Sequence, residues 1–189
     1  MDEISQRARD LCSVNVVRVE NGRLIGDMVD GLGFVKAVNL HGLNLNGKKV
    51  AIIGGGGAGA AIAYAIACSG ANEMIIKEIQ TKRHDFLKRL LRNANPEMKL
   101  SFELTRLDDF DLVINATPMG MNNDYSLPFP TDTLRPFTLV ADVVTHPKVT
   151  PWLADALKKG CKIQYGIEMA YGQFGFMGRH MGIDIPDPE

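Results

Sequence analysis

The feature that most constrains the fold is a run of four glycines, Gly54–Gly57, placed directly after the apolar segment Val50–Ile53. Glycine loses more conformational freedom on folding than any other residue, so a run of it beside a buried strand needs a structural reason. The residues that follow, 57–71, are small and apolar and predict a helix that packs closely on a sheet. The sequence therefore predicts a strand, a glycine-rich turn and a helix in direct succession.

Short apolar segments alternate with helical segments along the rest of the chain. The sequence predicts strands at 48–54, 72–79, 98–104, 111–116, 138–144 and 162–167, and helices at 57–71, 82–95, 150–161 and 169–182. Nearly all-apolar strands that alternate with helices indicate a parallel sheet covered on both faces. The expected fold class is therefore α/β, a doubly wound, mostly parallel Rossmann-type sheet with helices on both faces.

The segment before Lys48 breaks this alternation. Asn21-Gly22 between two apolar runs predicts a β-hairpin, and a helix with Asp30 as its N-cap follows.

Composition excludes several classes of protein. The net charge is −1, with 46% hydrophobic and 23% charged residues, so nothing points to nucleic acid or to a membrane surface, and no apolar run is long enough to span a bilayer. The cysteines Cys12, Cys68 and Cys161 lack paired spacing, and we expect the last two to be buried. Unpaired cysteines fit a reducing compartment, so we expect a cytoplasmic protein. The histidines are scattered, so we expect no metal site.

The glycine run contains the pattern G-x-G-x-x-G in the setting that binds a dinucleotide. Gly54 would allow the tight turn, Gly56 the approach of the pyrophosphate and Gly59 the close packing of helix on strand. Glu78, 24 positions after Gly54, stands where a ribose-binding carboxylate is expected. The alternatives are a glycine-rich turn in an unrelated α/β domain and the first loop of a methyltransferase. The cofactor-binding residues expected here are Gly54, Gly56, Gly57, Ala58, Gly59, Glu78 and Arg83.

Four further motifs carry a resemblance to the shikimate dehydrogenase family, which includes quinate/shikimate dehydrogenases and their paralogues. They are Ser13-Val14-Asn15, Gly26–Gly31, Asn115–Met121, and Gly166–Met169 followed by Gln173. Together with the glycine loop they cover practically the whole chain. The resemblance implies a nicotinamide-dependent oxidoreductase in aromatic amino acid biosynthesis.

The resemblance also implies roles for individual residues. Asp30 would be catalytic, paired with a lysine and holding the reacting hydroxyl, while Asn15 and Gln173 would bind the substrate with it. The residues implied at the nicotinamide are Thr117, Met119, Met121, Gly166 and Met169. Without the resemblance, Asp30 would be interpreted as a helix cap, Asn15 as a strand-edge residue and the methionines as core.

Departures from the family pattern accompany the match. The family's Asn-Thr before the aspartate is Met28-Val29 here, its Tyr-Asn-Pro is Thr145-His146-Pro147, and the second glycine of Gly-x-Gly-Met is Glu168. Because these positions are expected to border the substrate or the nicotinamide, they suggest a substrate other than shikimate. The family's N-terminal substrate domain, with its lysine motif, is not matched. We therefore expect residues 1–46 to be a hinge segment and connecting helix belonging partly to a substrate domain, and 47–189 to be the dinucleotide-binding domain with its C-terminal helix.

Two functions stay open at this point. The first is hydride transfer between a nicotinamide and a cyclic hydroxy acid such as shikimate, 3-dehydroshikimate or a quinate-like acid. The second is a catalytically inactive nucleotide-binding module or fragment. NAD is expected over NADP, because Glu78-Ile79-Gln80 replaces the Asn-Arg-Thr of NADP-using members, although Lys82 and Arg83 lie close by. The expected partner is a small-molecule substrate, without nucleic acid or membrane, and a homodimer is left open.

Overall fold

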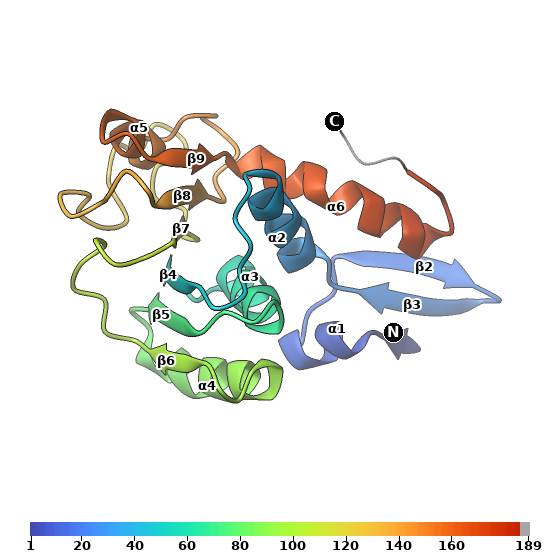
Figure 1. Cartoon of the computed structure of the whole chain (residues 1–189). Coiled ribbons are helices and arrows are strands. Elements are labelled where there is room, and N and C mark those ends of the chain that lie inside the picture. The colour runs from blue at the N-terminus through green and yellow to red at the C-terminus, as the bar shows by residue number, and fades with distance from the viewer. Residues whose placement is uncertain (186–189) are drawn as a thin grey trace.

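The computed structural model describes residues 1–185, and its elements follow one another as shown in Figure 1. Their bounds are β1 Glu3–Ile4, α1 Gln6–Leu11, β2 Val16–Glu20, β3 Arg23–Asp27, α2 Asp30–Leu40, β4 Lys49–Ile53, α3 Gly57–Cys68, β5 Glu73–Lys77, the 3₁₀ turn Thr81–Arg83, α4 His84–Ala94, β6 Lys99–Ser101, β7 Leu112–Asn115, β8 Leu139–Asp142, α5 Pro151–Lys158, β9 Lys162–Gln164 and α6 Gly166–Met181. From β4 onward, the order of strands and helices is the one predicted from the sequence.

Six strands form one sheet in the order β6-β5-β4-β7-β8-β9, and every neighbouring pair is parallel. The chain first moves outward from β4 through β5 to β6, then returns to the other side of β4 with β7. This reversal places a crevice between β4 and β7 at the carboxyl ends of the strands, where open α/β sheets bind their ligands. The predicted fold class, a doubly wound α/β sheet, is confirmed.

Helices cover both faces of this sheet because its strands are apolar on both sides. Val50 and Ile52 of β4 point into one core, which α2, α3 and α4 cover. Ala51 and Ile53, on the opposite face of the same strand, point into a second core that contains Trp152 of α5. Both cores are fully closed to solvent at their centres, so the sheet is a rigid base for the loops at its edge.

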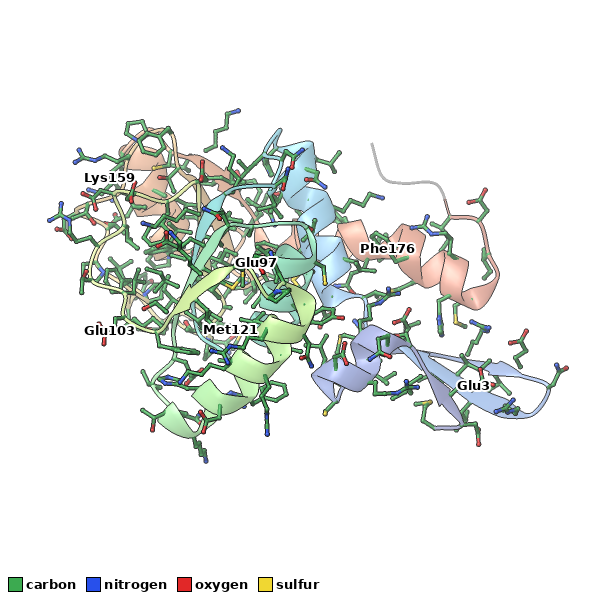
Figure 2. All side chains as sticks on the ribbon, turned by 60° about the horizontal axis from the view of Figure 1, so that its bottom comes forward. Glu3, Glu97, Glu103, Met121, Lys159 and Phe176 are labelled. Atoms are coloured by element: carbon green, nitrogen blue, oxygen red, sulfur yellow. The ribbon has the colours of Figure 1, made fainter. Side chains whose placement is uncertain are left out.

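A second, three-stranded sheet stands beside the first in the order β1-β3-β2. The predicted hairpin is confirmed: Asn21 and Gly22 both have positive φ, 51° and 77°, as a two-residue hairpin turn requires. Figure 1 shows α6 running from the large sheet to this hairpin, and Figure 2 places Glu3 of the small sheet and Lys159 at opposite sides of the molecule. His180 near the end of α6 bonds the Ile25 carbonyl, which joins the two parts.

Local sequence signals explain several helix ends. Thr150 caps α5 by accepting from the Leu153 N–H, with Pro151 in the first turn, as predicted. Gly70 has a φ of +85° directly after α3, again as predicted. The β6 strand is shorter than expected, and helix α1 was not predicted at all because six residues give too little periodicity.

Two expectations, one for Cys68 and one for Asp30, are wrong. Cys68 is exposed, because it lies at the end of α3 on the side that faces away from the sheet, whereas Cys161 is buried as expected. Asp30 does not cap α2: the cap position is Val29, without a side-chain hydrogen bond, and Asp30 is the first helical residue. Its carboxylate accepts a hydrogen bond from Asn15. Among residues 1–185 no helix is both long and apolar enough to cross a bilayer.

The close approach of α3 to the turn after β4 yields a testable expectation. A Cβ on Gly59 would lie 2.0 Å from the carbonyl oxygen of Gly54, while a Cβ on Gly57 would meet open space. Gly59→Ala should therefore lower the free energy of unfolding by about 1–3 kcal/mol, since backbone has to move to make room. Gly57→Ala is the matched control and should be nearly neutral. Urea unfolding measures both, and equal effects of the two substitutions would contradict this packing.

Candidate functional site: a dinucleotide cradle beside an amide–carboxylate cluster

The glycine-rich turn connects β4 to α3 at the crevice of the sheet. Gly54 has a φ of +97°, and a Cβ there would lie 2.8 Å from the Ala116 carbonyl oxygen, so only glycine fits. Gly59 closes the turn against Gly54, as noted above. The first and third glycines of the pattern thus have the geometric roles that the sequence predicted for them.

The N-terminus of α3 is open for an anion. Gly56 occupies the cap position without a side-chain hydrogen bond, and a Cβ on Gly56 or Gly57 would meet nothing within 4 Å. The first turn contains no acidic residue, so the positive end of the helix is not neutralised. A cavity of about 380 Å³ adjoins Gly57 and is lined in part by Lys82 and Arg83. A helix N-terminus with glycine backbone and two nearby cations fits a pyrophosphate.

Glu78 follows β5 and contacts the glycine loop directly. Its Oε2 accepts from the Gly55 N–H at 2.7 Å, and its Oε1 accepts from the Gln80 N–H at 2.7 Å. Arg83 donates from Nε to the Gly55 carbonyl at 2.9 Å. Both predicted side chains therefore reach the loop, and Glu78 also shapes it. The side chain of Ile79, the residue after Glu78, is 87% exposed.

The residues expected near a nicotinamide come from two places. Thr117, Met119 and Met121 follow the end of β7, while Gly166 and Met169 lie in the first turn of α6, directly after β9. These strands lie on the opposite side of β4 from Glu78, so a dinucleotide across the crevice would reach both groups. Met169 is buried, and a Cβ on Gly166 would lie 2.2 Å from the Val144 carbonyl oxygen. Met121 is 41% exposed at the surface of its loop.

A buried polar network lies beneath this loop, and the sequence did not reveal it. Asn115 donates from Nδ2 to Asp142 at 3.1 Å and to the Met119 carbonyl at 3.1 Å, and its Oδ1 accepts from both the N–H and the hydroxyl of Thr117. Asp142 also accepts from the Thr150 hydroxyl at 2.7 Å. A signal was present, since Asn115 and Asp142 are polar residues at the ends of otherwise apolar strands.

The three candidate substrate residues come together from three elements. Asn15 precedes β2, Asp30 begins α2 and Gln173 lies in α6. Asn15 Nδ2 donates to Asp30 Oδ1 at 2.6 Å and approaches Gln173 Oε1 at 3.4 Å, while its own Oδ1 accepts from the Val29 N–H. The carboxylate of Asp30, the first residue of α2, thus bonds Asn15 and does not cap the helix.

Two glycines bring α2 and α6 close enough for this cluster to form. A Cβ on Gly33 would lie 2.4 Å from Gln173 Cγ, and a Cβ on Gly172 would lie 2.2 Å from the Gly33 carbonyl oxygen. The helices therefore cross at Gly33 and Gly172, one turn away from Asp30 and beside Gln173. Glycine at this crossing permits the close contact that larger residues would prevent.

Burial changes the electrostatics of the cluster. Loss of solvent raises the pKa of Asp30 above its ordinary value, and the hydrogen bonds from Asn15 and Gln173 only partly offset this. At Asp27, three residues earlier, burial also raises the pKa, but hydrogen bonds from Ser5, Arg7 and the Met28 N–H outweigh it and leave the net pKa lowered. The two neighbouring carboxyls therefore differ: Asp27 is ion-paired with Arg7 and has a lowered pKa, whereas burial dominates at Asp30 and raises its pKa.

The departures from the family pattern have structural explanations in part. Glu168 does not reach the cluster; its Oε2 accepts from the Tyr165 N–H at 2.6 Å, and both oxygens lie 3.2 Å from His41 Nε2 at the end of α2. Met28 is buried and packs with Ala8 and Ala61. His146 is exposed in the loop after β8. Glu168 and Met28 thus also have contacts within the protein, and the expectation that these positions border the substrate or the nicotinamide stays a prediction.

In the described part of the chain, no group of three or more His, Cys, Asp and Glu side chains is arranged to hold a metal ion. Three lysines near Asp30 in sequence have partners of their own. Lys48 donates to Asp111, Lys49 to Asp109, and Lys36 lies over the Phe176 ring at 5.9 Å.

The sheet, the glycine cradle and the crevice define a dinucleotide-binding α/β protein of the Rossmann type. No protein-family model matches the sequence. Among curated proteins, the shikimate dehydrogenase (NADP(+)) of Geobacillus kaustophilus is 31% identical over 175 residues, which cover 89% of this chain and 62% of that protein. The enzyme of the same name from Lactococcus lactis subsp. cremoris is 30% identical, over 97% of this chain and 70% of that protein. The chain belongs to the shikimate dehydrogenase family, and the resemblance stated from its motifs is confirmed.

Solved structures agree with this assignment. Shikimate 5-dehydrogenase from Listeria monocytogenes, in complex with shikimate and NAD, superposes with a TM-score of 0.87 at 27% identity over 98% of this chain and 69% of that one. The 5-ketofructose reductase of a Gluconobacter species gives the same TM-score at 29% identity over 99% and 69%. The chain spans about three fifths of the length of the first curated relative.

The raised pKa of Asp30 gives a pH-dependent expectation. Below the ordinary value of 3.8 the group is protonated in both folded and unfolded chains; above it the unfolded chain releases its proton first, so stability is lost as pH rises through the folded pKa. Asp30→Asn removes this loss and keeps an oxygen for Asn15. The variant should therefore gain stability relative to the parent between about pH 3 and pH 7. Urea unfolding at both pH values measures the difference, and a difference that shrinks toward neutral pH would overturn it.

Proposed function

We propose that this chain binds a nicotinamide dinucleotide and forms the cofactor-binding part of a dehydrogenase that acts on a cyclic hydroxy acid. The observation that carries the proposal is the convergence of Asn15, Asp30 and Gln173 beside a dinucleotide crevice. Two amides and a carboxylate can bond neighbouring hydroxyl groups as donors and acceptors at once. When bound, the nicotinamide would accept or donate the hydride, and the residues of this chain would hold the reactants.

Each part of the chain has a separate task in this proposal. The N-terminus of α3 and the backbone at Gly56–Ala58 hold the pyrophosphate, with Arg83 nearby. Asn15 and Gln173 orient the substrate, and Asp30 bonds the hydroxyl whose carbon is oxidised. The proton of that hydroxyl passes to a lysine paired with Asp30. The family resemblance implies this lysine, but the sequence contains no match to the motif that carries it.

Binding at the glycine loop is tested by one substitution. Gly56→Val should abolish NAD binding, because the side chain would enter the open space that the phosphates need, while the fold has room for it. Isothermal titration calorimetry measures the affinity, and the unfolding temperature checks that the fold is kept. Unchanged affinity in a folded variant would place the cofactor elsewhere.

We further propose that NAD binds more tightly than NADP. Glu78 would repel a 2′-phosphate, and Ile79 replaces the arginine that would face it. Lys82 and Arg83 reduce the difference. Among the relatives both cofactors occur: the Geobacillus protein is named for NADP(+), and the Listeria structure contains NAD.

The double variant Glu78→Gln/Ile79→Arg should reverse the preference toward NADP, by about tenfold or more, because it removes one repulsive charge and adds a phosphate-binding one. The glutamine side chain would still offer an oxygen to the Gly55 N–H. Ile79→Gln is the matched control and should leave the ratio unchanged. Tighter binding of NADP than NAD by the unsubstituted chain would contradict the proposed preference.

The chain by itself should show no dehydrogenase turnover with shikimate, quinate or related acids. Because this sequence contains no match to the family's lysine motif, proton transfer should be missing and the rate should be lower by several powers of ten, on the order of the combined effects of positioning and acid–base catalysis. Absorbance of the reduced nicotinamide follows the reaction. Fusion to the substrate domain of a full-length relative should restore turnover, and Asp30→Asn in the fusion should then depress the rate far more than cofactor affinity. Robust activity of the unfused chain would mean that its own residues supply the proton acceptor.

A further inference from the structure

We propose that Asp142 is a positioning residue for the nicotinamide end of the site, acting through Asn115 and Thr150 on the loop Thr117–Met121. The inference rests on the proposed function, because it concerns the part of the crevice that would hold the nicotinamide. Asp142 touches neither cofactor nor substrate in this proposal. It determines where the loop that borders them lies.

Asp142 is completely buried at the carboxyl end of β8, paired in register with Asn115 at the end of β7. Its Oδ1 accepts from Asn115 Nδ2 at 3.1 Å and from the Val144 N–H at 2.9 Å, and its Oδ2 accepts from the Thr150 hydroxyl at 2.7 Å. The carboxylate is thus tied to three separate segments: β7, the turn after β8, and the first turn of α5.

A carboxylate only accepts hydrogen bonds, so it fixes the orientation of the Asn115 amide. The amide nitrogen must face Asp142, and the amide oxygen is then turned toward the loop. There it accepts from the Thr117 N–H at 3.0 Å and from the Thr117 hydroxyl at 2.6 Å, and that hydroxyl accepts from the Met119 N–H at 3.2 Å. If the amide were reversed, its nitrogen would face the Thr117 N–H, donor against donor, and the backbone bond that holds the start of the loop would be lost.

The second connection fixes the far end of the same loop. Gly120 has a φ of +90° and packs on Thr150, since a Cβ there would lie 3.3 Å from Thr150 Cβ. Thr150 is held by its bond to Asp142 and by the N-terminus of α5, where it accepts from Leu153. One buried carboxylate therefore determines both the start of the loop and the surface on which its end rests.

Such a carboxylate is costly in an apolar core. Burial raises the pKa of Asp142, against which the hydrogen bonds from Thr150, Val144 and Asn115 act. Strand pairing of β7 with β8 does not need it, because the ladder is made by backbone groups. Both of its side-chain partners, Asn115 and Thr150, contact the loop, which favours a positioning role over general stabilisation of the sheet.

Two ligands separate these roles. NAD spans both halves of the crevice, whereas ADP-ribose carries the adenosine and pyrophosphate without the nicotinamide. Asp142→Ala should weaken NAD binding by about tenfold, as expected for losing hydrogen bonds to a charged group, and change ADP-ribose binding by less than about twofold. Asp142→Asn is the conservative control: the Val144 N–H keeps the oxygen of its amide facing Asn115, so NAD affinity should be largely retained. Calorimetry of the whole chain measures all three affinities.

A second pair of variants keeps the test decisive where Asp142→Ala does not fold. Thr150→Val removes the hydroxyl and keeps the shape, and should weaken NAD selectively, while Thr150→Ser should behave as the parent. Equal weakening of NAD and ADP-ribose, or no change in either, would overturn the positioning role. Failure of the proposed function would look different, because it concerns the unsubstituted chain. That chain would bind neither NAD nor ADP-ribose, or would bind both equally tightly with no contribution from the nicotinamide. The positioning role of Asp142 would then be overturned as well.

Discussion

The contact between the first turn of α3 and the turn that precedes it sets the position of everything else at the crevice. Only 2.0 Å would separate a Cβ on Gly59 from the Gly54 carbonyl oxygen, so the helix begins as near to the sheet as backbone atoms allow. Its N-terminus is thereby fixed at the crevice between β4 and β7. Glu78 and Arg83 both bond the Gly55 backbone, so the next βα connection is tied to the same point. The cradle is therefore defined by the glycine backbone and by the two side chains that bond it.

Polar groups at this edge of the sheet are organised in two clusters of different kinds. The cluster under the loop after β7 is buried. Its side chains, those of Asn115, Thr117, Asp142 and Thr150, bond one another within the protein, and such a closed network is suited to holding a loop in place. The Asn15–Asp30–Gln173 cluster is partly open, since Asn15 is exposed and Asp30 half-buried. Polar groups that converge in a partly open site are available to a ligand, whereas those of the closed network are not.

The two sheets of the molecule meet through α2 and α6, and the candidate site lies at that junction. The crossing at Gly33 and Gly172 brings Asp30 and Gln173 together, and α6 continues past them to the hairpin, where His180 and Arg18 make further bonds. Glu168 bonds the start of α6 and faces His41 at the end of α2. A residue that departs from the family motif therefore also supports the pairing of these helices.

Local rules of sequence were sufficient to predict the class of fold and the position of the glycine-rich turn, while the family was predicted from the resemblance of its motifs. Glycines stand where a turn and a close approach require them, the strands are short and apolar, and the motifs follow one another in a fixed order. The hairpin at Asn21-Gly22 and the cap at Thr150 were predictable for the same reason, because turn and cap chemistry acts within a few residues. Asp30 was misplaced as a cap and Cys68 as core, since each depends on what lies across from it in space.

Which polar residues bond one another follows from tertiary contacts alone. Asn15 and Gln173 are separated by 158 positions, and Asn115 and Asp142 by 27, so no local pattern relates them. The register of β7 with β8 brings the second pair together, and the helix crossing brings the first. Parallel pairing and helix packing join segments that are distant in the chain, and the chemistry of a site at the carboxyl edge of such a sheet follows from that joining.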